Sequence, residues 1–550
     1  MGAGCSLRLP HTPRDTPPAD GKPSPPSAPA AKPAVRLAAT PSVSSAYTSI
    51  SSAATSSLEL SFPILTLPAA AVLQLDVFPA HEAASVVAWR REDGPLCFVS
   101  HQWLALHHPD PSASQLRVLQ RVLSRLLAGE LQVYGLRAAE AASLHVWLDF
   151  WSVPQDAAAA ARRHAAIHSI PAYAAAAAFM LVLCPPATHA DSGQVCNYAT
   201  WERRGWCRLE RLAYWMSNFC IDRSPTLLIA SSGASVEKGI VSQHQMNAAH
   251  QSVFCGDFSY DDDRTSLFPV VHAVYTHAVA AHKAAGEGAA WRKLQALGRV
   301  YFHGCHEWRP PPPPPTAAHF LERYGMASVR EHAAAGMTAL HYAALEDNPA
   351  TIDLLIAAGA YPDARDSSRF PLGTGATPLL YAALHGASSA VAALLSHRAD
   401  PNAASLHSAP LVWKLAFAAG AQLSPPAAEA CAAAVLAAGG HVDAVATADR
   451  GAAGPAWELY GTTPLALAAL RGHRRLAALL LEAGARPEMP CLRGGRHGGR
   501  TAAELAREGE GGEELAAMVE AAAARGAGHA QRFVSHAVWA PSKPFVSYAE

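Results

Sequence analysis

LCFVS at residues 96–100, LHVWLDF at 144–150 and FMLVLC at 179–184 decide the fold of the first half of this chain. Each is a short apolar run, and helical patterns separate them. A fourth candidate strand covers residues 226–230. Such alternation is typical of βαβ units that build a parallel sheet. We therefore expect an α/β domain, and we look for its site just past the carboxyl ends of the strands, where such sheets bind ligands.

Helical patterns fill the gaps between these runs. Asp110 opens one in which leucines between 116 and 127 form an apolar stripe, with arginines on the other faces. Asp156 is placed to cap another helix. Residues 201–217 predict an amphipathic helix, and residues 266–285 predict a long helix that closes the domain. Residues 233–264 show no pattern that we assign.

Composition limits the classes of function. The 550 residues carry a formal net charge of −1, so no bulk electrostatic attraction to nucleic acid is expected. Ten cysteines are scattered without a disulfide rhythm or a zinc-finger spacing, which favours a reducing intracellular setting and no metal site. No apolar run approaches the roughly 20 residues that a membrane-spanning helix needs.

The first six residues, MGAGCS, fit the pattern for N-myristoylation of Gly2 once Met1 is removed. One myristoyl chain gives only marginal membrane binding, and Cys5 is placed to add palmitate as the second signal. The alternative is a chance Met-Gly start. Residues 1–58 are rich in proline, serine and alanine and predict a disordered tether. We expect a lipid-anchored protein on the cytoplasmic face of a membrane, or otherwise a cytoplasmic one.

Three segments of the second half repeat one pattern: TALHYAA at 338–344, TPLLYAA at 377–383 and TPLALAA at 463–469. Each precedes a second apolar helical pattern. These segments resemble ankyrin repeats, in which a threonine starts the first helix and a glycine ends the second. The resemblance implies an all-α solenoid that binds partner proteins along its concave face.

The rest of the second half fits the same array. Degenerate units lie at 409–443 and from 501 onward, and a leading unit runs from near Phe320 to Gly336. About five units exceed the roughly three that a stable stack needs. We divide the chain into the tether, an α/β domain with flanking segments at 60–305, a proline-rich linker at 308–316, ankyrin repeats at 317–526 and a tail at 527–550. The linker is a spacer or, alternatively, a ligand for an SH3-type or WW-type domain.

The α/β domain resembles a TIR (Toll/interleukin-1 receptor) domain. FVS at 98–100, WLD at 147–149 and GWCRLE at 205–210 stand in the order of the TIR motifs. Asn197-Tyr198 matches the start of the plant-type segment before Trp-Cys-x-x-Glu. The WLDF segment with Pro154-Gln155 is also similar to fungal heterokaryon-incompatibility domains, which are TIR-like. The resemblance covers residues 95–230 and implies a flavodoxin-like fold, with TIR-type self-association as one expectation.

The resemblance also implies an activity. Enzymatic TIR domains cleave nicotinamide from NAD⁺, and the glutamate of Trp-Cys-x-x-Glu is their catalytic residue, which here is Glu210. Nicotinamide leaves as a neutral molecule without a general acid, and a carboxylate can stabilise the oxocarbenium-like ribose. Ser100 and Asp149 are then expected at the nucleotide, with Trp103 and Trp151 stacking on a ring. NAD⁺ would be a substrate, and no cofactor is required.

Several features keep other interpretations open. Glu210 would serve equally well as a solvated helix residue beside Arg203 or Arg211. TIR adaptors keep the fold without activity. The chain lacks the Gly-rich loop common after the second strand of plant TIR domains, and His101-Gln102-Trp103 replaces the usual polar-basic run after the first. The leading prediction is a membrane-tethered signalling or scaffold protein, and the alternative is a TIR-type NAD⁺ nucleosidase.

Overall fold

The computed structural model describes residues 58, 60–133, 136–218, 226–232, 234–240, 251–259, 261–333, 336–367, 375–403, 409–420, 422–446, 459–492 and 496–527. It forms two compact units, Met1–Pro311 and Pro312–Glu550, and the division falls inside the proline run. The tether with Gly2 and Cys5 lies outside the described residues, apart from Leu58. The predicted tail also lies outside them, apart from Ala527.

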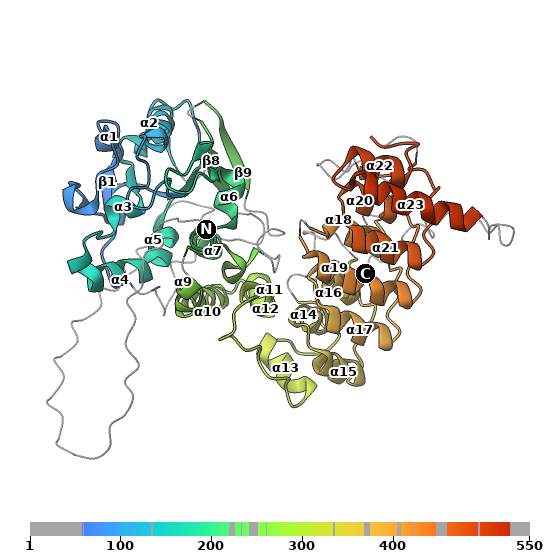
Figure 1. Cartoon of the computed structure of the whole chain (residues 1–550). Helices are drawn as coiled ribbons and strands as arrows, with labels where there is room; N and C mark the ends of the chain where they lie inside the picture. The colour runs from blue at the N-terminus through green and yellow to red at the C-terminus, as the bar shows by residue number, and fades with distance from the viewer. Residues whose placement is uncertain are drawn as a thin grey trace, which may run out of the picture. The chain divides into compact units, whose positions relative to one another are not determined.

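A seven-stranded sheet in the order β2-β1-β4-β3-β5-β8-β9 is the frame of the first unit (Figure 1). The four central strands β4, β3, β5 and β8 are parallel. The other three pair antiparallel at the two edges, so the sheet is mixed and the predicted parallel sheet describes only its centre. The strands are β1 (Leu65–Pro68), β2 (Val87–Ala88), β3 (Leu96–His101), β4 (His145–Trp147), β5 (Phe179–Leu183), β8 (Thr226–Ala230) and β9 (Val236–Ile240).

The central strands form because their apolar runs are buried on both faces. All six residues of β3 and all five of β5 are buried, as expected for strands inside a sheet covered by helices. Helix α2 (Ser114–Leu127) packs against β5 and β8 through its leucine stripe. Helices α5 (Ile170–Ala176) and α7 (Gly205–Asn218) contact β3, and the sheet lies between them and α2 in Figure 1.

The predicted helix at 201–217 is two helices, α6 (Tyr198–Arg203) and α7, which break at Arg204. Asn197 caps α6 by accepting a hydrogen bond from the Thr200 amide at 3.1 Å. Gly205 starts α7 against the Phe258 ring, where a Cβ atom would lie only 1.9 Å from a ring carbon. The sequence pattern missed the break because both helices keep one apolar periodicity.

The remaining elements of the first unit were only partly expected. The predicted closing helix is α10 (Phe268–Ala284), but two more helices follow it. Asp110 accepts the Ser114 and Leu116 amides at 2.8 Å and so fixes the start of α2 as predicted. The other elements are α1 (Ala69–Val72), η2 (His81–Ala83), η3 (Arg91–Asp93), η4 (Ala138–Ser143), α3 (Asp149–Ser152), η5 (Ala157–Ala159), α4 (Ala160–His168), β6 (Ala187–Thr188), β7 (Val195–Cys196), η7 (Val253–Cys255), α9 (Asp261–Ser266), α11 (Gly288–Ala296) and α12 (Gly298–Tyr301).

The second unit is a stack of helix pairs that follows the chain from α13 to α23 (Figure 1). Thr338, Thr377, Thr463 and Thr501 each cap the first helix of a pair. The helices are α13 (Ala317–Tyr324), α14 (Ala339–Glu346), α15 (Pro349–Ala357), α16 (Pro378–Leu384), α17 (Ser388–Ser396), α18 (Leu411–Ala418), α19 (Pro425–Ala437), α20 (Pro464–Leu470), α21 (Arg474–Glu482), α22 (Ala502–Glu508) and α23 (Gly512–Ala527).

Hydrogen bonds also link the turn of each pair to the turn of the next. Asp363 accepts the Asp400 amide at 2.9 Å, and Asn402 accepts the His441 amide at 2.8 Å. Asp443 accepts the Arg486 amide at 3.1 Å. The same relative position therefore supplies the acceptor in three successive turns, and each turn holds its neighbour.

Candidate functional site

The candidate site lies at the carboxyl end of β3, where two successive residues point in different directions. Ser100 is fully buried and contacts Glu210 of α7. His101 contacts Gln115 of α2 on the other side of the strand. This divergence follows from the alternation of side chains along a strand. The end of β3 therefore lies between two polar groups, one on the side of the sheet that α7 covers and one on the side that α2 covers.

Ser100 and Glu210 form the first group. The Ser100 hydroxyl donates to Oε2 of Glu210 at 2.5 Å and accepts the indole Nε1–H of Trp201 at 2.9 Å. Glu210 is only 8% exposed. The interpretation of Glu210 as a solvated helix residue is therefore wrong. Arg211 instead pairs with Glu202 at 3.1 Å, and Arg203 lies 3.7 Å from Asp257.

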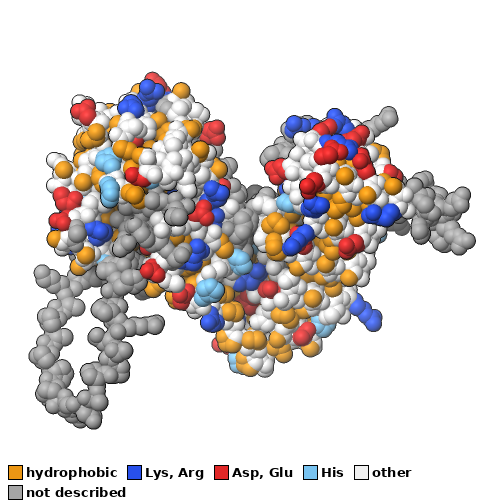
Figure 2. All heavy atoms as spheres, viewed as in Figure 1, with side chains coloured by type: hydrophobic (Ala, Val, Ile, Leu, Met, Phe, Trp, Pro, Cys, Tyr) orange, Lys and Arg blue, Asp and Glu red, His pale blue; other side chains and the backbone are white. Residues whose placement is uncertain are grey.

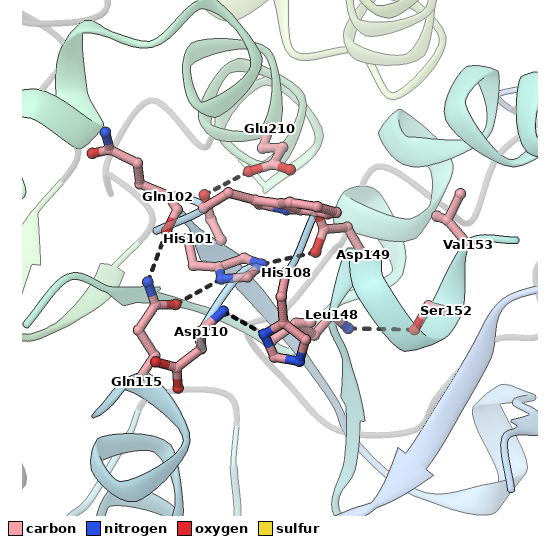
Figure 3. A network of polar contacts seen from close by, with 12 residues as sticks. His101, Gln102, His108, Asp110, Gln115, Leu148, Asp149, Ser152, Val153 and Glu210 are labelled. Carbon is pink, nitrogen blue, oxygen red and sulfur yellow. Dashed lines mark hydrogen bonds and ion pairs between the residues drawn. The ribbon is translucent and has the colours of Figure 1, made fainter. Parts of the chain in front are cut away.

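His101 and Asp149 form the second group (Figure 3). Nε2 of His101 lies 2.7 Å from Oδ1 of Asp149, at the start of α3, and Nδ1 lies 2.7 Å from Oε1 of Gln115. The Trp103 indole donates to Oδ2 of Asp149 at 2.8 Å. Gln115 also donates to the Gln102 carbonyl at 2.7 Å. Both oxygens of Asp149 are thereby held by neighbouring donors.

The two groups differ in charge. Burial raises the pKa of Glu210 to about 8, and the nearby Asp149 charge adds to this, although the Ser100 hydrogen bond acts in the opposite direction. Burial opposes the charge on His101, but Asp149 and the hydrogen bonds outweigh it and raise the pKa of His101. Burial also opposes ionisation of Asp149. The charge of His101 and the hydrogen bonds to Asp149 together have the larger effect, so the pKa of Asp149 is lowered. The contact between His101 and Asp149 therefore favours the charged form of each, whereas Glu210 keeps its proton up to about pH 8.

The structure brings together four of the five predicted nucleotide-site residues: Ser100, Trp103, Asp149 and Glu210. Trp151 is not among them. Its side chain is fully buried in the hydrophobic core and its Nε1 donates to the Val146 carbonyl at 3.3 Å. The ring offers no free face for stacking, because α3 turns the chain back into the core directly after Asp149.

Sequence reasoning missed His101, Gln115 and Trp201 as members of the site. His101 follows Ser100 directly, and the Gln115 contact depends on how α2 docks on the sheet, which no spacing reveals. Trp201 is the first residue of the helix predicted at 201–217, and that pattern does not mark it as a site residue. A buried tryptophan needs a partner for its indole N–H, and here that partner is the hydroxyl that contacts Glu210.

The cluster is largely closed to solvent in this conformation. Ser100 is 0% exposed, and the Asp149 side chain, at 17%, is more open than that of His101. Within the described part of the chain, no group of three or more metal-ligating side chains occurs. The arrangement offers one buried acid that titrates near pH 8 and one oriented carboxylate.

Comparison with known families settles the second unit. Residues 315–405 match ankyrin repeats in three copies, and residues 460–491 match an ankyrin repeat. The second unit contains ankyrin repeats. The degenerate ankyrin units at 409–443 and from 501 lie outside these matches, yet each forms a helix pair, α18 with α19 and α22 with α23. No curated protein matches the chain.

The ankyrin repeats support a role in protein–protein interaction. On the face that Figure 2 shows, acidic and basic side chains are interspersed over the described surface rather than gathered by sign. No helix among the described residues combines the length and the apolar character that crossing a bilayer requires.

Proposed function

We propose that this protein is a membrane-tethered intracellular signalling or scaffold protein whose ankyrin repeats hold partner proteins. The ankyrin match is the observation that carries the proposal. The closed state of the cluster in the first unit agrees with a structural role for that unit. Tethering rests on the sequence pattern at Gly2 and Cys5, and it would place the protein on the cytoplasmic face of a membrane.

Partner binding is tested by co-purification of the full chain with proteins cross-linked to it in cells. Tyr361, 64% exposed on the turn after α15, is the residue to change. Partners recovered with wild type should be lost or reduced with Tyr361→Asp and kept with Arg475→Asp, which alters an exposed residue of α21. Equal recovery with all three proteins, or no cross-link within the ankyrin unit, would contradict the proposal.

The tether is tested by labelling with a myristate analogue and by membrane fractionation. We expect label on the wild-type chain and none on Gly2→Ala. Cys5→Ser should keep the label yet release the protein from the membrane fraction, because one acyl chain binds only marginally. Label retained on Gly2→Ala would exclude myristoylation of Gly2.

The second candidate function is NAD⁺ cleavage by a TIR-like first unit. The β4-β3-β5-β8 order of its parallel strands is 2-1-3-4 in chain sequence, which is the flavodoxin-like order and supports the likeness. The Ser100–Glu210 contact favours this candidate, because it brings the glutamate of the motif to the strand end where TIR domains act. Such a reaction requires the closed cluster to open for the substrate.

The pKa of Glu210 gives this candidate a specific signature. An ionised carboxylate stabilises an oxocarbenium-like ribose, whereas a protonated one does not. With a pKa of about 8, nicotinamide release should rise with pH through 8. The assay is nicotinamide release from NAD⁺ by the full chain, with Glu210→Ala expected to abolish it and Glu92→Ala, at an exposed position, expected to keep it. No turnover at high protein concentration leaves the scaffold function alone.

A further inference from the structure

The Ser100 hydroxyl connects two buried side chains that come from different helices. Its oxygen accepts the Trp201 indole N–H at 2.9 Å and lies 2.5 Å from Oε2 of Glu210. An indole nitrogen is a donor only, so the serine cannot donate to Trp201. The hydroxyl proton of Ser100 is therefore directed at Glu210, and two successive hydrogen bonds run from the indole to the carboxyl group.

Trp201 is held in place for this contact. It is fully buried, whereas Tyr198 and Thr200 on the same short helix are half-buried. The Tyr198 ring stacks on the indole with centroids 5.5 Å apart and 23° between the planes. The Arg211 guanidinium lies 6.0 Å from the centroid of the indole ring. These neighbours restrict the ring, so its N–H stays directed at Ser100.

The direction of the Ser100 proton decides which form of Glu210 is favoured. A hydroxyl that donates to a carboxyl group stabilises the ionised form, and hydrogen bonds to a charged group are stronger than those between neutral groups. A donor to the serine oxygen strengthens this effect, because successive hydrogen bonds polarise one another. Trp201 also occupies one of the two lone pairs with which the serine could accept the proton of a neutral Glu210.

We propose that Trp201 is a positioning residue that acts through Ser100 to favour the ionised form of Glu210. Trp201 lies outside the GWCRLE segment at 205–210 and precedes it on a separate helix. The consequence for catalysis rests on the second candidate function, in which ionised Glu210 stabilises the ribose. There Trp201 lowers the pH at which the site becomes active.

Other groups also act on the Glu210 carboxyl. Burial has the largest effect in raising the pKa of Glu210, and the charge of Asp149 at the start of α3 adds to it. The charges of His101 on β3 and Arg204 between α6 and α7 lower this pKa. Burial raises the pKa of the Cys207 thiol on α7 far above its usual range, so this thiol stays neutral. Because His101 also titrates nearby, the decisive measurement is one made on the Glu210 carboxyl itself.

The test is a ¹³C NMR titration of the full chain labelled at the glutamate carboxyl carbons. The Glu210 signal is the one that is missing from Glu210→Gln, and in wild type it should titrate near pH 8. Trp201→Phe keeps an aromatic ring but lacks the N–H. It should move the midpoint up by about 0.5–1 pH unit, which is the equivalent of one hydrogen bond. Ser100→Ala, which removes the contact to the carboxyl, should move the midpoint further up.

Trp151→Phe is the matched control. It removes an indole N–H that donates to the Val146 carbonyl at 3.3 Å rather than to Ser100. Its Glu210 midpoint should equal that of wild type. An unchanged midpoint in Trp201→Phe would overturn the proposal and would leave Trp201 as a packing residue.

Nicotinamide release from NAD⁺ separates this proposal from the candidate function on which its catalytic consequence rests. If the full chain cleaves NAD⁺, the rise of the rate with pH should move to higher pH in Trp201→Phe and stay in place in Trp151→Phe. Absence of turnover in wild type would contradict NAD⁺ cleavage, and the carboxyl titration would still decide the role of Trp201.

A measurement on wild type decides the case in which Trp201→Phe does not fold. In a chain labelled with ¹⁵N-tryptophan, the Nε1–H signal of Trp201 should shift with the same midpoint as the Glu210 carboxyl, because the charge polarises both hydrogen bonds. Ser100→Ala removes the acceptor of this N–H and so identifies the signal. The shift should be absent in Glu210→Gln. A Trp201 signal that does not change as the pH passes through 8 would overturn the proposal.

Discussion

Glu210 is kept out of water by α7 and the end of β3, and it is held there by a serine rather than by a cation. The unfolded chain would ionise this carboxyl near pH 4.5, whereas the folded chain does so near 8. Between these values the folded state binds the extra proton. Its stability therefore falls as the pH rises through this window, and the fall levels off above it.

Glu210→Gln should remove this dependence. Glutamine resembles the protonated acid and can still accept from Ser100. Each pKa unit corresponds to about 1.4 kcal/mol, so the shift from 4.5 to about 8 sets an upper limit of about 5 kcal/mol on the gain of the variant relative to wild type between pH 5 and 9. Urea unfolding of the first unit at several pH values measures this. Glu92→Gln should follow wild type, and parallel pH curves for wild type and Glu210→Gln would contradict the assigned proton.

Lys414 is a second residue whose charge opposes folding. It occupies the position that Ala343, Ala382 and Ala468 fill in the other ankyrin pairs, and those alanines are fully buried. Burial lowers the pKa of Lys414 to about 8, although the Asp366 charge acts in the opposite direction. Below pH 8 the lysine is charged in both states, so the full penalty of burial applies there. The penalty fades as the pH rises toward 10.5.

Lys414→Met should therefore stabilise the ankyrin unit by about 1–3 kcal/mol at pH 7, with a smaller gain at pH 10. Urea unfolding at both pH values measures the change. Arg475→Met, at an exposed position of α21, should stay within about 0.5 kcal/mol of wild type. A destabilised Lys414→Met chain would show that the lysine makes a net favourable contact.

The second helix of several ankyrin repeats ends at a residue in the left-handed backbone conformation. Gly359, Gly439 and Gly484 follow the second helices of their pairs with φ between 90° and 94°. Arg398 occupies the same place after α17 with φ 64°. For a residue with a Cβ atom, this left-handed conformation costs about 1–2 kcal/mol.

Arg398→Gly should stabilise the ankyrin unit by about 1 kcal/mol, because glycine adopts this conformation without strain. The free energy of unfolding from urea titration is the measurement. Arg398→Ala is the matched control: it also removes the exposed side chain but keeps the Cβ atom, and it should give no gain. An equal gain in both variants would assign the effect to charge rather than to the backbone.

Sequence reasoning succeeded where one physical signal dominated. The runs at β3 and β5 are continuous because both faces are buried, and parallel strands bring Ser100 and Asp149 to one edge of the sheet. Helix α7 places Glu210 against Ser100 at that edge. Strands β1 and β2, which lie at one end of the sheet, were missed because they are only four and two residues long. Trp151 does not lie at the predicted nucleotide site, because α3 reverses the chain within one turn. The apolar pattern of β4 does not indicate this reversal.

At the scale of the whole molecule, each unit has its own buried core. We expect calorimetry of the full chain to show two transitions. Lys414→Met and Arg398→Gly should shift one of them, and Glu210→Gln at pH 9 should shift the other. A single transition that moves with all three variants would show that the two units unfold together.

The hydrogen bonds between successive ankyrin turns determine how the array responds to mechanical load. Asp363, Asn402 and Asp443 each accept a hydrogen bond from the following turn, so these repeats are held to their neighbours in the sequence. Tension applied at the carboxyl end should peel the array from α23 inward, one pair at a time. An optical trap would record this as a sawtooth of small force peaks rather than a single rupture.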